Sequence, residues 1–256
     1  MLINAVILIL REVIEASLIV SLFLAYSQRS GKAKTVLLPA LFLGGIFATI
    51  YAINISSISQ WLDGAGQEAT NASISILLYL FLLLFVITTV SKKTKQNRQL
   101  SIIAMIAGIT LATTQEGTEI ILYIHGFFSS PELFKPVLFG SLIGAGIGLS
   151  FGIFIYYLLV NVSRKTGFII GYILILLVAG SMVLQTAQLL AQIDWIPSQY
   201  PLWDSSELIS ERSLTGQLLY ALIGYEATPT ATQVIGYSIS LLLFLAITIF
   251  TLKKNK

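Results

Sequence analysis

Seven long apolar stretches, separated by short polar breaks, constrain this chain more than any other feature of its sequence. A helix needs about 20 apolar residues to cross about 30 Å of hydrocarbon. With 56% hydrophobic and 11% charged residues, the chain also has too little polar surface to cover a water-soluble globule. The sequence therefore predicts an all-α integral membrane protein and excludes soluble enzymes and nucleic-acid binders. We expect seven transmembrane helices, over residues 2–26, 35–56, 72–90, 100–124, 136–160, 168–191 and 232–252.

The positive charges alternate between the segments that join these helices. The segments after the first, third, fifth and seventh predicted helices hold 12 of the 15 Lys and Arg residues and no Asp or Glu. The other segments carry eight acidic residues against Lys135 and Arg212. Because Lys and Arg near span ends are retained on the cytoplasmic side, we expect the N-terminus outside, the C-terminus inside and an acidic outer face.

Two features recur in the same order in the first and second halves of the chain. Residues 11–15 read REVIE and residues 115–119 read QEGTE, each about halfway along a predicted helix, and the next helices open PALF at 39–42 and PVLF at 136–139. Two three-helix units joined head to tail have opposite orientations in the bilayer. We therefore expect one permease domain over 1–256 that contains an inverted 3+3 repeat. Its parts are repeat one (about 1–95), repeat two (96–191), an outer loop with an amphipathic helix (192–231) and helix seven (232–252).

The recurring motifs place four carboxylates near the predicted bilayer centre. Glu12 and Glu15 are three residues apart and share a helix face, and Glu116 and Glu119 repeat that spacing. A carboxylate at this depth is costly and is expected to face a polar interior. Four that converge cannot all ionise without a cation among them, so we expect a metal site.

The available donor atoms indicate which metals fit. The candidate site offers carboxylates and nearby hydroxyls but no cysteine, because the chain has none. Oxygen donors favour Fe3+, Fe2+, Mn2+, Mg2+ or Ca2+ over Cu(I) or Zn2+. Arg11 adds one positive charge, which leaves a net charge of about −3 that suits a trivalent ion. Gln115 and Thr118 are expected to support the glutamates.

Other interpretations of these residues remain open. The glutamates could form a buried ion-pair network that fixes helix register. A carboxylate-bridged di-iron enzyme is a second alternative, although such bundles use Glu-x-x-His pairs and neither motif ends in His. His125 is either a polar cap at the outer interface or a metal ligand. Gln185, Gln188 and Gln192 either line an entry path or bond neighbouring helices.

Small residues predict close helix contacts around the site. Glycine recurs every fourth residue from Gly140 to Gly152, and Ala104, Gly108 and Ala112 form a similar stripe. Such spacing lets helix backbones approach closely.

The long outer loop contains a predicted amphipathic helix. Asp204 reads as its N-cap with Glu207 as the capping-box partner, and the helix is expected to end at Gly224. Asp204, Glu207 and Glu211 could capture cations at the entrance or simply form a solvated face.

Taken together, these features resemble the high-affinity, oxidase-dependent iron permeases of the iron/lead transporter type. The resemblance rests on Arg-Glu-x-x-Glu at 11–15, the second Glu-x-x-Glu at 116–119, the seven spans, and WDSS at 203–206 followed by SERS at 210–213. It implies import of iron, as ferric ion, across the cytoplasmic membrane through Glu12, Glu15, Glu116 and Glu119.

The resemblance also implies partners and leaves alternatives. Fungal members pair with a multicopper ferroxidase, and bacterial members work with cupredoxin-like and haem-peroxidase partners outside the membrane. Iron would be the substrate, with no permanently bound cofactor and no enzymatic activity. The chain departs from the pattern at Gln115, where Arg often heads the second motif, and at Val13, where Gly often follows the first Glu. Mn2+ or Pb2+ are the alternative substrates, and an intramembrane metalloenzyme is the alternative class.

Overall fold

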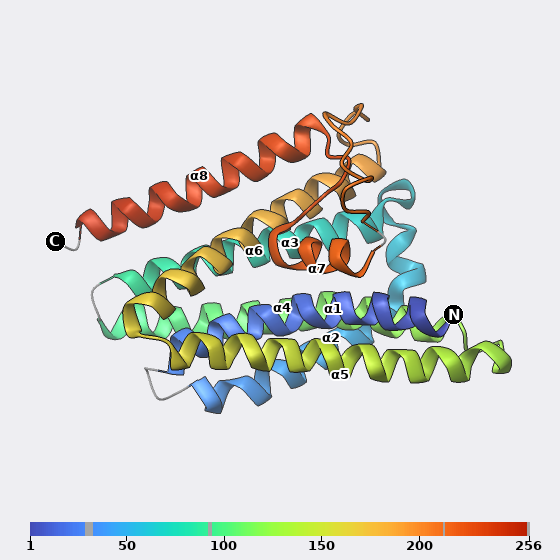
Figure 1. The fold of residues 1–256 in the computed structure, drawn as a ribbon, viewed down its shortest axis with the longest axis horizontal. Helices are drawn as coiled ribbons and strands as arrows, with labels where there is room; N and C mark the ends of the chain where they lie inside the picture. The colour runs from blue at the N-terminus through green and yellow to red at the C-terminus, as the bar shows by residue number, and fades with distance from the viewer. Residues whose placement is uncertain (29–32, 92–93, 212, 255–256) are drawn as a thin grey trace.

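A computed structural model describes residues 1–28, 33–91, 94–211 and 213–254 and is built almost entirely from helices (Figure 1). The long helices lie side by side. The helices predicted over residues 35–56 and 232–252 extend beyond both predicted ends. The helices are α1 (Leu2–Ser27), α2 (Ala33–Ser59), the short 3-10 helix η2 (Trp61–Gly64), α3 (Gly66–Val90), α4 (Lys95–His125), α5 (Pro131–Asn161), α6 (Arg164–Gln192), α7 (Leu214–Ile223) and α8 (Ala231–Lys254).

Each of the seven predicted stretches is helical, and within the described residues six of these helices are long and apolar enough to cross a membrane. The six are α2, α3, α4, α5, α6 and α8. The remaining long helix, α1, has 26 residues and carries Arg11, Glu12 and Glu15 near its middle. The prediction of an all-α membrane protein is therefore confirmed, with six spans identified by length and composition.

Several helices begin earlier than their apolar runs predict. Helix α4 begins five residues before the predicted residue 100, because the Thr94 side chain accepts a hydrogen bond from the Asn97 N–H and caps the first turn. Ser163 caps α6 in the same way, and Pro131 occupies the first turn of α5. The polar end turns are helical but carry no apolar signal, so hydropathy alone places these boundaries too late.

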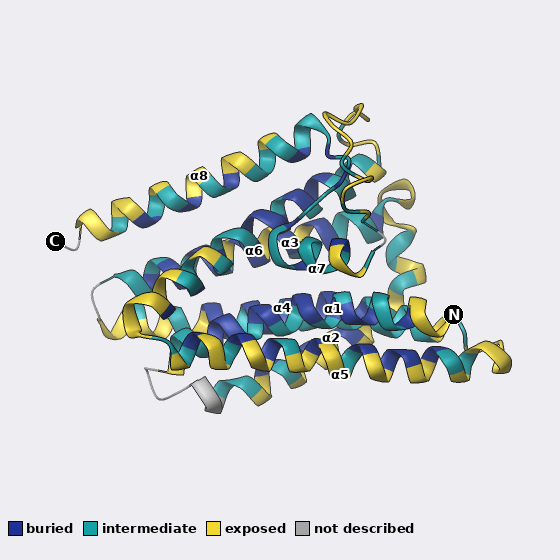
Figure 2. Cartoon of the chain, in the orientation of Figure 1, coloured by how far each residue is buried: buried dark blue, intermediate teal, exposed yellow. Residues whose placement is uncertain are grey.

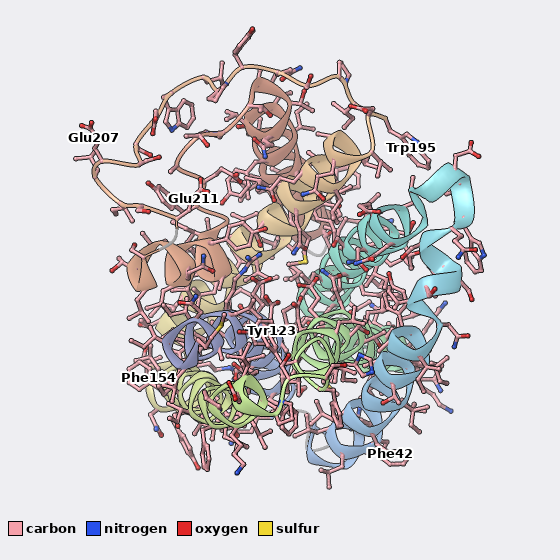
Figure 3. The ribbon with its side chains drawn as sticks, turned by 90° about the vertical axis from the view of Figure 1, so that its right-hand side faces the viewer. Phe42, Tyr123, Phe154, Trp195, Glu207 and Glu211 are labelled. Carbon is pink, nitrogen blue, oxygen red and sulfur yellow. The ribbon has the colours of Figure 1, made fainter. Side chains whose placement is uncertain are left out.

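The sides of the bundle that face away from its interior carry exposed apolar residues. Yellow stripes run along α5 and α8 in Figure 2, and large side chains on α2 and α5 point away from the interior, including Phe42 (71% exposed) and Phe154 (59%) (Figure 3). Such a surface is suited to hydrocarbon rather than water. The interior instead packs aromatic and aliphatic side chains of α1, α3, α4 and α6, among them Phe23, Phe85 and Leu82.

Glycines bring α1 and α5 into close contact, as the spacing predicts. A Cβ atom on Gly144 would lie 2.6 Å from the Val6 carbonyl oxygen, and one on Gly152 would lie 2.6 Å from the Ser17 Cβ. Gly140 and Gly148 face α1 in the same way. Only glycine permits this separation of the two backbones.

Hydroxyl groups link the helices of two pairs, α2 with α4 and α1 with α5. On α4, the hydroxyls of three threonines spaced four apart lie 3.2 to 3.4 Å from carbonyl oxygens of α2. The pairs are Thr110 with Ala40, Thr114 with Gly44 and Thr118 with Ala48. The Thr114 and Thr118 hydroxyls also donate within α4, to the carbonyls of Thr110 and Thr114 at 2.7 and 2.6 Å, so their contacts with α2 are the longer branch of a shared hydrogen bond. On α1, Ser17 and Ser21 donate to the carbonyls of Gly148 and Gly152 at 3.1 and 2.7 Å.

The helix within the loop of residues 192–231 begins nine residues later than the sequence predicts. Asp204 is not its N-cap, because the carboxylate accepts the N–H of Ser206 in a local turn. The cap is Ser213, whose hydroxyl accepts the Gly216 N–H at 3.0 Å. The predicted end is confirmed: Gly224 closes α7 in the left-handed conformation, with φ of 68°.

Candidate metal site

Three of the four predicted glutamates meet in the interior of the bundle. Glu12 of α1 and Glu116 and Glu119 of α4 each offer a carboxylate oxygen, and these oxygens lie within 4.8 Å of one another. Glu12 is 3% exposed and Glu116 is 2% exposed, while Glu119 is half-buried. Oxygens on opposite sides of a cation at about 2.4 Å would be about 4.8 Å apart, so the cluster has a suitable size for a hard metal ion.

The fourth glutamate, Glu15, is buried beside this cluster but is held by an arginine. Its Oε1 accepts a hydrogen bond from Arg11 Nε at 3.1 Å, which forms an ion pair across one turn of α1. The Arg11 guanidinium carbon also lies 4.1 Å from the centroid of the Tyr220 ring of α7. Arg11 therefore connects the buried carboxylates to the helix of the outer loop through an ion pair and a cation–π contact.

The two expected supporting residues bond to neighbouring helices. The Gln115 side chain donates to Gln185 of α6 at 3.1 Å and accepts from Ser75 of α3 at 3.3 Å. Thr118 donates to the Ala48 carbonyl, as described above. Both residues thus fix α4, which carries Glu116 and Glu119, and the structure gives neither a bond to the cluster.

A cavity of about 530 Å3 lies at the outer-loop end of the site. Its lining includes Arg11 and Tyr220 together with Glu211, Glu226 and Gln188. Figure 3, which looks onto this end of the molecule, shows Glu211 nearer the centre of the bundle than Glu207. Arg11 belongs both to this cavity and to the ion pair with Glu15, so it lies between the cavity and the buried carboxylates.

The acidic residues of the outer loop have different surroundings. Asp204 and Glu207 are exposed, and hydrogen bonds from Ser206 lower the pKa of Asp204. Glu211 accepts the Ala227 N–H at 2.7 Å. Burial, followed by repulsion from Glu211, raises the pKa of Glu226 to about 7, against the opposing attraction of Arg11.

Two of the open alternatives can now be examined from the geometry. Gln185 bonds to α3 and α4, as one of the two alternatives for the glutamine stripe predicts, whereas Gln188 and Gln192 line the cavity. His125 is exposed at the end of α4, with its ring 6.0 Å from that of Phe128, and it lies outside the group of carboxylates.

Tyr220 and Glu226 are site residues that the sequence analysis did not identify. Tyr220 donates its hydroxyl to Gln188 at 3.2 Å, and the Gln188 amide donates to Glu226. The contacts depend on the outer loop folding back against α1 and α6, which no local pattern predicts. Gln188, which the sequence analysis places in a polar stripe, was the one indication that polar side chains would pack against this face of α6.

A bundle of long apolar helices with carboxylates in its interior defines a multi-pass membrane protein with a buried acidic centre. Residues 2–253 match the model of the Iron permease FTR1 family, and the chain belongs to that family. It is thus a multi-pass protein of the plasma membrane in a family of iron permeases, as the sequence resemblance predicts.

Curated relatives of similar length support this assignment. The chain is 26% identical over 254 residues to the "Ferrous iron permease EfeU" of Yersinia pestis, covering 91% of this chain and 88% of the relative. It is 22% identical over 253 residues to the protein of the same name from Escherichia coli O6:H1, covering 92% and 91%. No solved structure matches the chain.

Proposed function

We propose that the chain imports iron through the cluster of Glu12, Glu116 and Glu119. Glu15 would be a fourth carboxylate, which can contact the ion once its ion pair with Arg11 is broken. The observation that carries the proposal is the convergence of three carboxylate oxygens, two of them from buried residues and one from a half-buried residue, on two helices about 100 residues apart in the chain. Buried carboxylates repel one another in a low-dielectric interior. A cation that enters the cluster would relieve this repulsion while it replaces part of its hydration shell.

We further propose that α1 is the seventh span and that the bundle is an inverted repeat with an outer N-terminus and an inner C-terminus. At 1.5 Å per residue, 26 residues reach about 39 Å, which is enough to cross the membrane. The packing of α1 along α5 and of α2 along α4 supports the repeat, because a two-fold axis that exchanges α1 with α4 and α2 with α5 also exchanges these two pairs. The carboxylates explain why α1 is less apolar than the other long helices.

The outer cavity is the proposed entrance. Asp204 and Glu207 would concentrate cations near the loop, and Glu211 and Glu226 would receive them in the cavity. Arg11 would then have to leave its place beside the cavity for an ion to reach the cluster. Because a cation and a guanidinium repel each other, the approach of the ion itself favours that displacement.

The membrane potential and the outer partner complete the proposed transport process. A potential of 100 mV, negative inside, favours inward movement by about 2.3 kcal/mol per unit of positive charge. The sequence resemblance favours Fe3+ and an extracytoplasmic ferroxidase, cupredoxin-like or haem-peroxidase partner. The curated relatives carry "ferrous" in their names, so both oxidation states belong in the experiment.

Uptake of radioactive iron by cells that express the protein tests the proposal. Iron is supplied as Fe2+ with ascorbate or as Fe3+ with citrate, with Mn2+ and Pb2+ as competitors. Replacement of Glu12, Glu116 or Glu119 by Gln should reduce uptake at least tenfold at equal protein level. Glu132→Gln is the matched control, because Glu132 is exposed at the start of α5.

Each alternative predicts a different result. Wild-type uptake by all three cluster variants would refute the site. Accumulation of Mn2+ or Pb2+ in place of iron would keep the route and change the substrate. Turnover by purified protein with a permanently bound metal would instead indicate an enzyme.

A further inference from the structure

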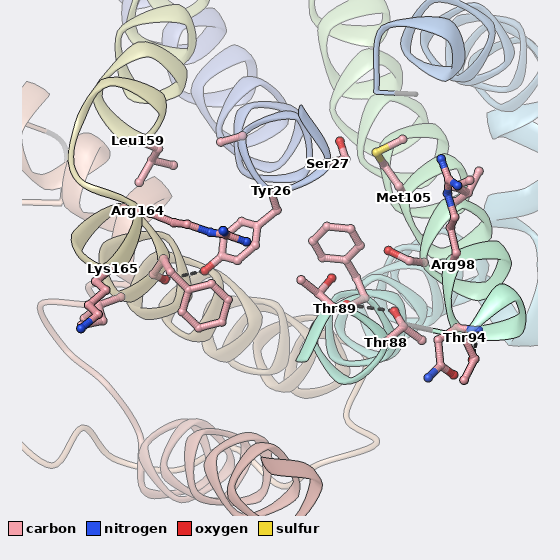
Figure 4. Close-up of a pocket in the computed structure, with 18 of the residues that line it drawn as sticks. Tyr26, Ser27, Thr88, Thr89, Thr94, Arg98, Met105, Leu159, Arg164 and Lys165 are labelled. Carbon is pink, nitrogen blue, oxygen red and sulfur yellow. Dashed lines mark hydrogen bonds between the residues drawn. The ribbon is translucent and has the colours of Figure 1, made fainter. Parts of the chain in front are cut away.

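A second cavity lies at the opposite end of the bundle from the outer loop, where α1 and α3 end (Figure 1). Figure 4 shows its lining in close-up. It has a volume of about 1010 Å3 and lies between the last turns of α1 and α3 and the first turns of α4 and α6. The volume is at the upper end of the range for small-molecule sites. The lining includes neither the glutamate cluster nor Arg11, so any ligand here binds at a separate site.

All charged residues that line this basic pocket, among the residues the structure describes, are cationic. Lys95 and Arg98 come from α4, and Arg164 and Lys165 come from α6. In Figure 4, Arg98 and Arg164 lie on opposite sides of the pocket, with Thr89 between them. Four positive charges would repel a metal cation, so the pocket suits an anion instead.

The N-termini of α4 and α6 lie at the basic pocket and strengthen its preference for an anion. The first turns of α4 and α6, capped by Thr94 and Ser163, contribute to the pocket or border it. Helix N-termini carry a partial positive charge and favour anions. The helix ends and the cationic side chains therefore act with the same sign.

The wall of the basic pocket is apolar, which narrows the class of anion. Phe85, Met105 and Leu159 are buried and line its interior, and Phe168 and Ile169 line it at the surface, where they are 37% and 56% exposed. A small hydrated anion gains nothing from contact with such a wall. A ligand that joins an anionic group to an apolar body can contact the cations and the apolar wall together.

We propose that the basic pocket binds an anionic phospholipid. The phosphate of the lipid would lie between Arg98 and Arg164, and an acyl chain would lie against Phe168 and Ile169. Guanidinium groups match the geometry of phosphate oxygens and can bind them in bidentate fashion. Basic pockets between membrane helices commonly serve lipid headgroups of this charge. Free phosphate shares the headgroup chemistry but makes no use of the apolar wall.

Native mass spectrometry of the purified full-length protein tests this proposal. The protein is mixed with phosphatidylglycerol or with phosphatidylcholine that carries the same acyl chains, and bound lipid is counted as the concentration rises. Wild type should retain phosphatidylglycerol preferentially. Combined Arg98→Gln and Arg164→Gln should weaken its binding at least tenfold, because each cation near an anionic lipid contributes several-fold in affinity.

Two further variants separate the pocket from general charge and folding effects. Lys253→Gln with Lys254→Gln removes two charges from the end of α8, outside the pocket lining, and should change binding less than twofold. Thr89→Trp fills the pocket without a change of charge and should also weaken binding at least tenfold. If the arginine variant does not fold, as judged by size-exclusion chromatography, Thr89→Trp decides the question.

Three results would overturn the proposal. Equal retention of the two lipids would remove the charge argument, and an equal loss in the α8 variant would indicate a nonspecific effect of net charge. Displacement of phosphatidylglycerol by an equal concentration of inorganic phosphate would show that the pocket binds phosphate without using its apolar wall. None of these readouts depends on iron uptake, so failure here is distinguishable from failure of the proposed permease site.

Discussion

The contact of α1 with α5 at Gly144 offers a sensitive test of how packing positions the glutamates. In a Gly144→Ala variant, the new Cβ would lie 2.6 Å from the Val6 carbonyl oxygen and 3.0 Å from the Leu10 backbone nitrogen. Both neighbours are backbone atoms of α1, so no side-chain rotation relieves the clash. Restoring an ordinary separation of 3.4 Å requires the helices to move apart by about 0.8 Å.

This displacement should affect both stability and transport. Overpacking of an interior contact costs about 1–3 kcal/mol. For a chain of 256 residues, this corresponds to a fall in Tm of about 2–12 °C. Leu10 is two residues before Glu12 on the same helix, so the shift also moves the Glu12 carboxylate relative to those of Glu116 and Glu119. Because misplacement of functional groups by about 1 Å can cost up to 100-fold in rate, we expect iron uptake to fall at least tenfold.

Gly146→Ala provides the matched control on the same helix. No atom lies within 4 Å of a Cβ placed on Gly146, and alanine favours helix by about 0.5–1 kcal/mol over glycine. We expect unchanged uptake and an equal or slightly higher Tm. Thermal unfolding of the purified variants and uptake at equal membrane level are the measurements. If Gly144→Ala behaved like Gly146→Ala in both assays, the reasoning from close helix contact would be refuted.

Three further outcomes are expected. Tyr220→Leu removes the ring that Arg11 contacts and should lower the free energy of unfolding by about 0.5–2 kcal/mol more than Tyr220→Phe does; equal losses in denaturant titrations would exclude a role for the cation–π contact. Gln115→Ala removes two side-chain hydrogen bonds, one from Ser75 and one to Gln185, while the bond between Ser75 and Gln185 remains; it should cost about 1–3 kcal/mol in the same titrations, a prediction that a neutral variant would contradict. Because the pKa of Glu226 rises on folding from 4.5 to about 7, the folded state binds the proton more tightly, so the free energy of unfolding should fall as pH rises across this interval. Glu226→Gln should flatten that decrease, and an unchanged slope would refute the assignment.

The sequence predicted the helices well because their signal is local. Hydropathy located all seven helical stretches, and the four-residue spacing from Gly140 to Gly152 predicted a close helix contact, although not that α1 is the partner. Capping was predictable only where the local geometry was unambiguous. Gly224 ends α7 as expected, whereas Asp204 forms a two-residue turn because its short side chain reaches the Ser206 N–H first.

The candidate site was only partly predictable, because its details depend on tertiary contacts. The i, i+3 spacing correctly places Glu116 and Glu119 on one face of α4, where both reach Glu12. The same spacing on α1 does not reveal that Glu15 pairs with Arg11, since side-chain rotamers and the position of Tyr220 decide that competition. Residues that approach through the outer loop carry no periodic pattern, so the sequence could not identify them.

The hydroxyl contacts that link α2 with α4 and α1 with α5 also bear on which parts of the bundle can move as units. Thr110, Thr114 and Thr118 contact carbonyl oxygens on successive turns of α2 at 3.2 to 3.4 Å, so sliding of one helix along the other would break several polar contacts together. Ser17 and Ser21 tie α1 to α5 in the same manner. We therefore expect each pair to move as a rigid body, with Glu12 in one body and Glu116 and Glu119 in the other. Opening of the carboxylate cluster would then require only that two rigid bodies part where α1 meets α4, with every helix keeping its own shape.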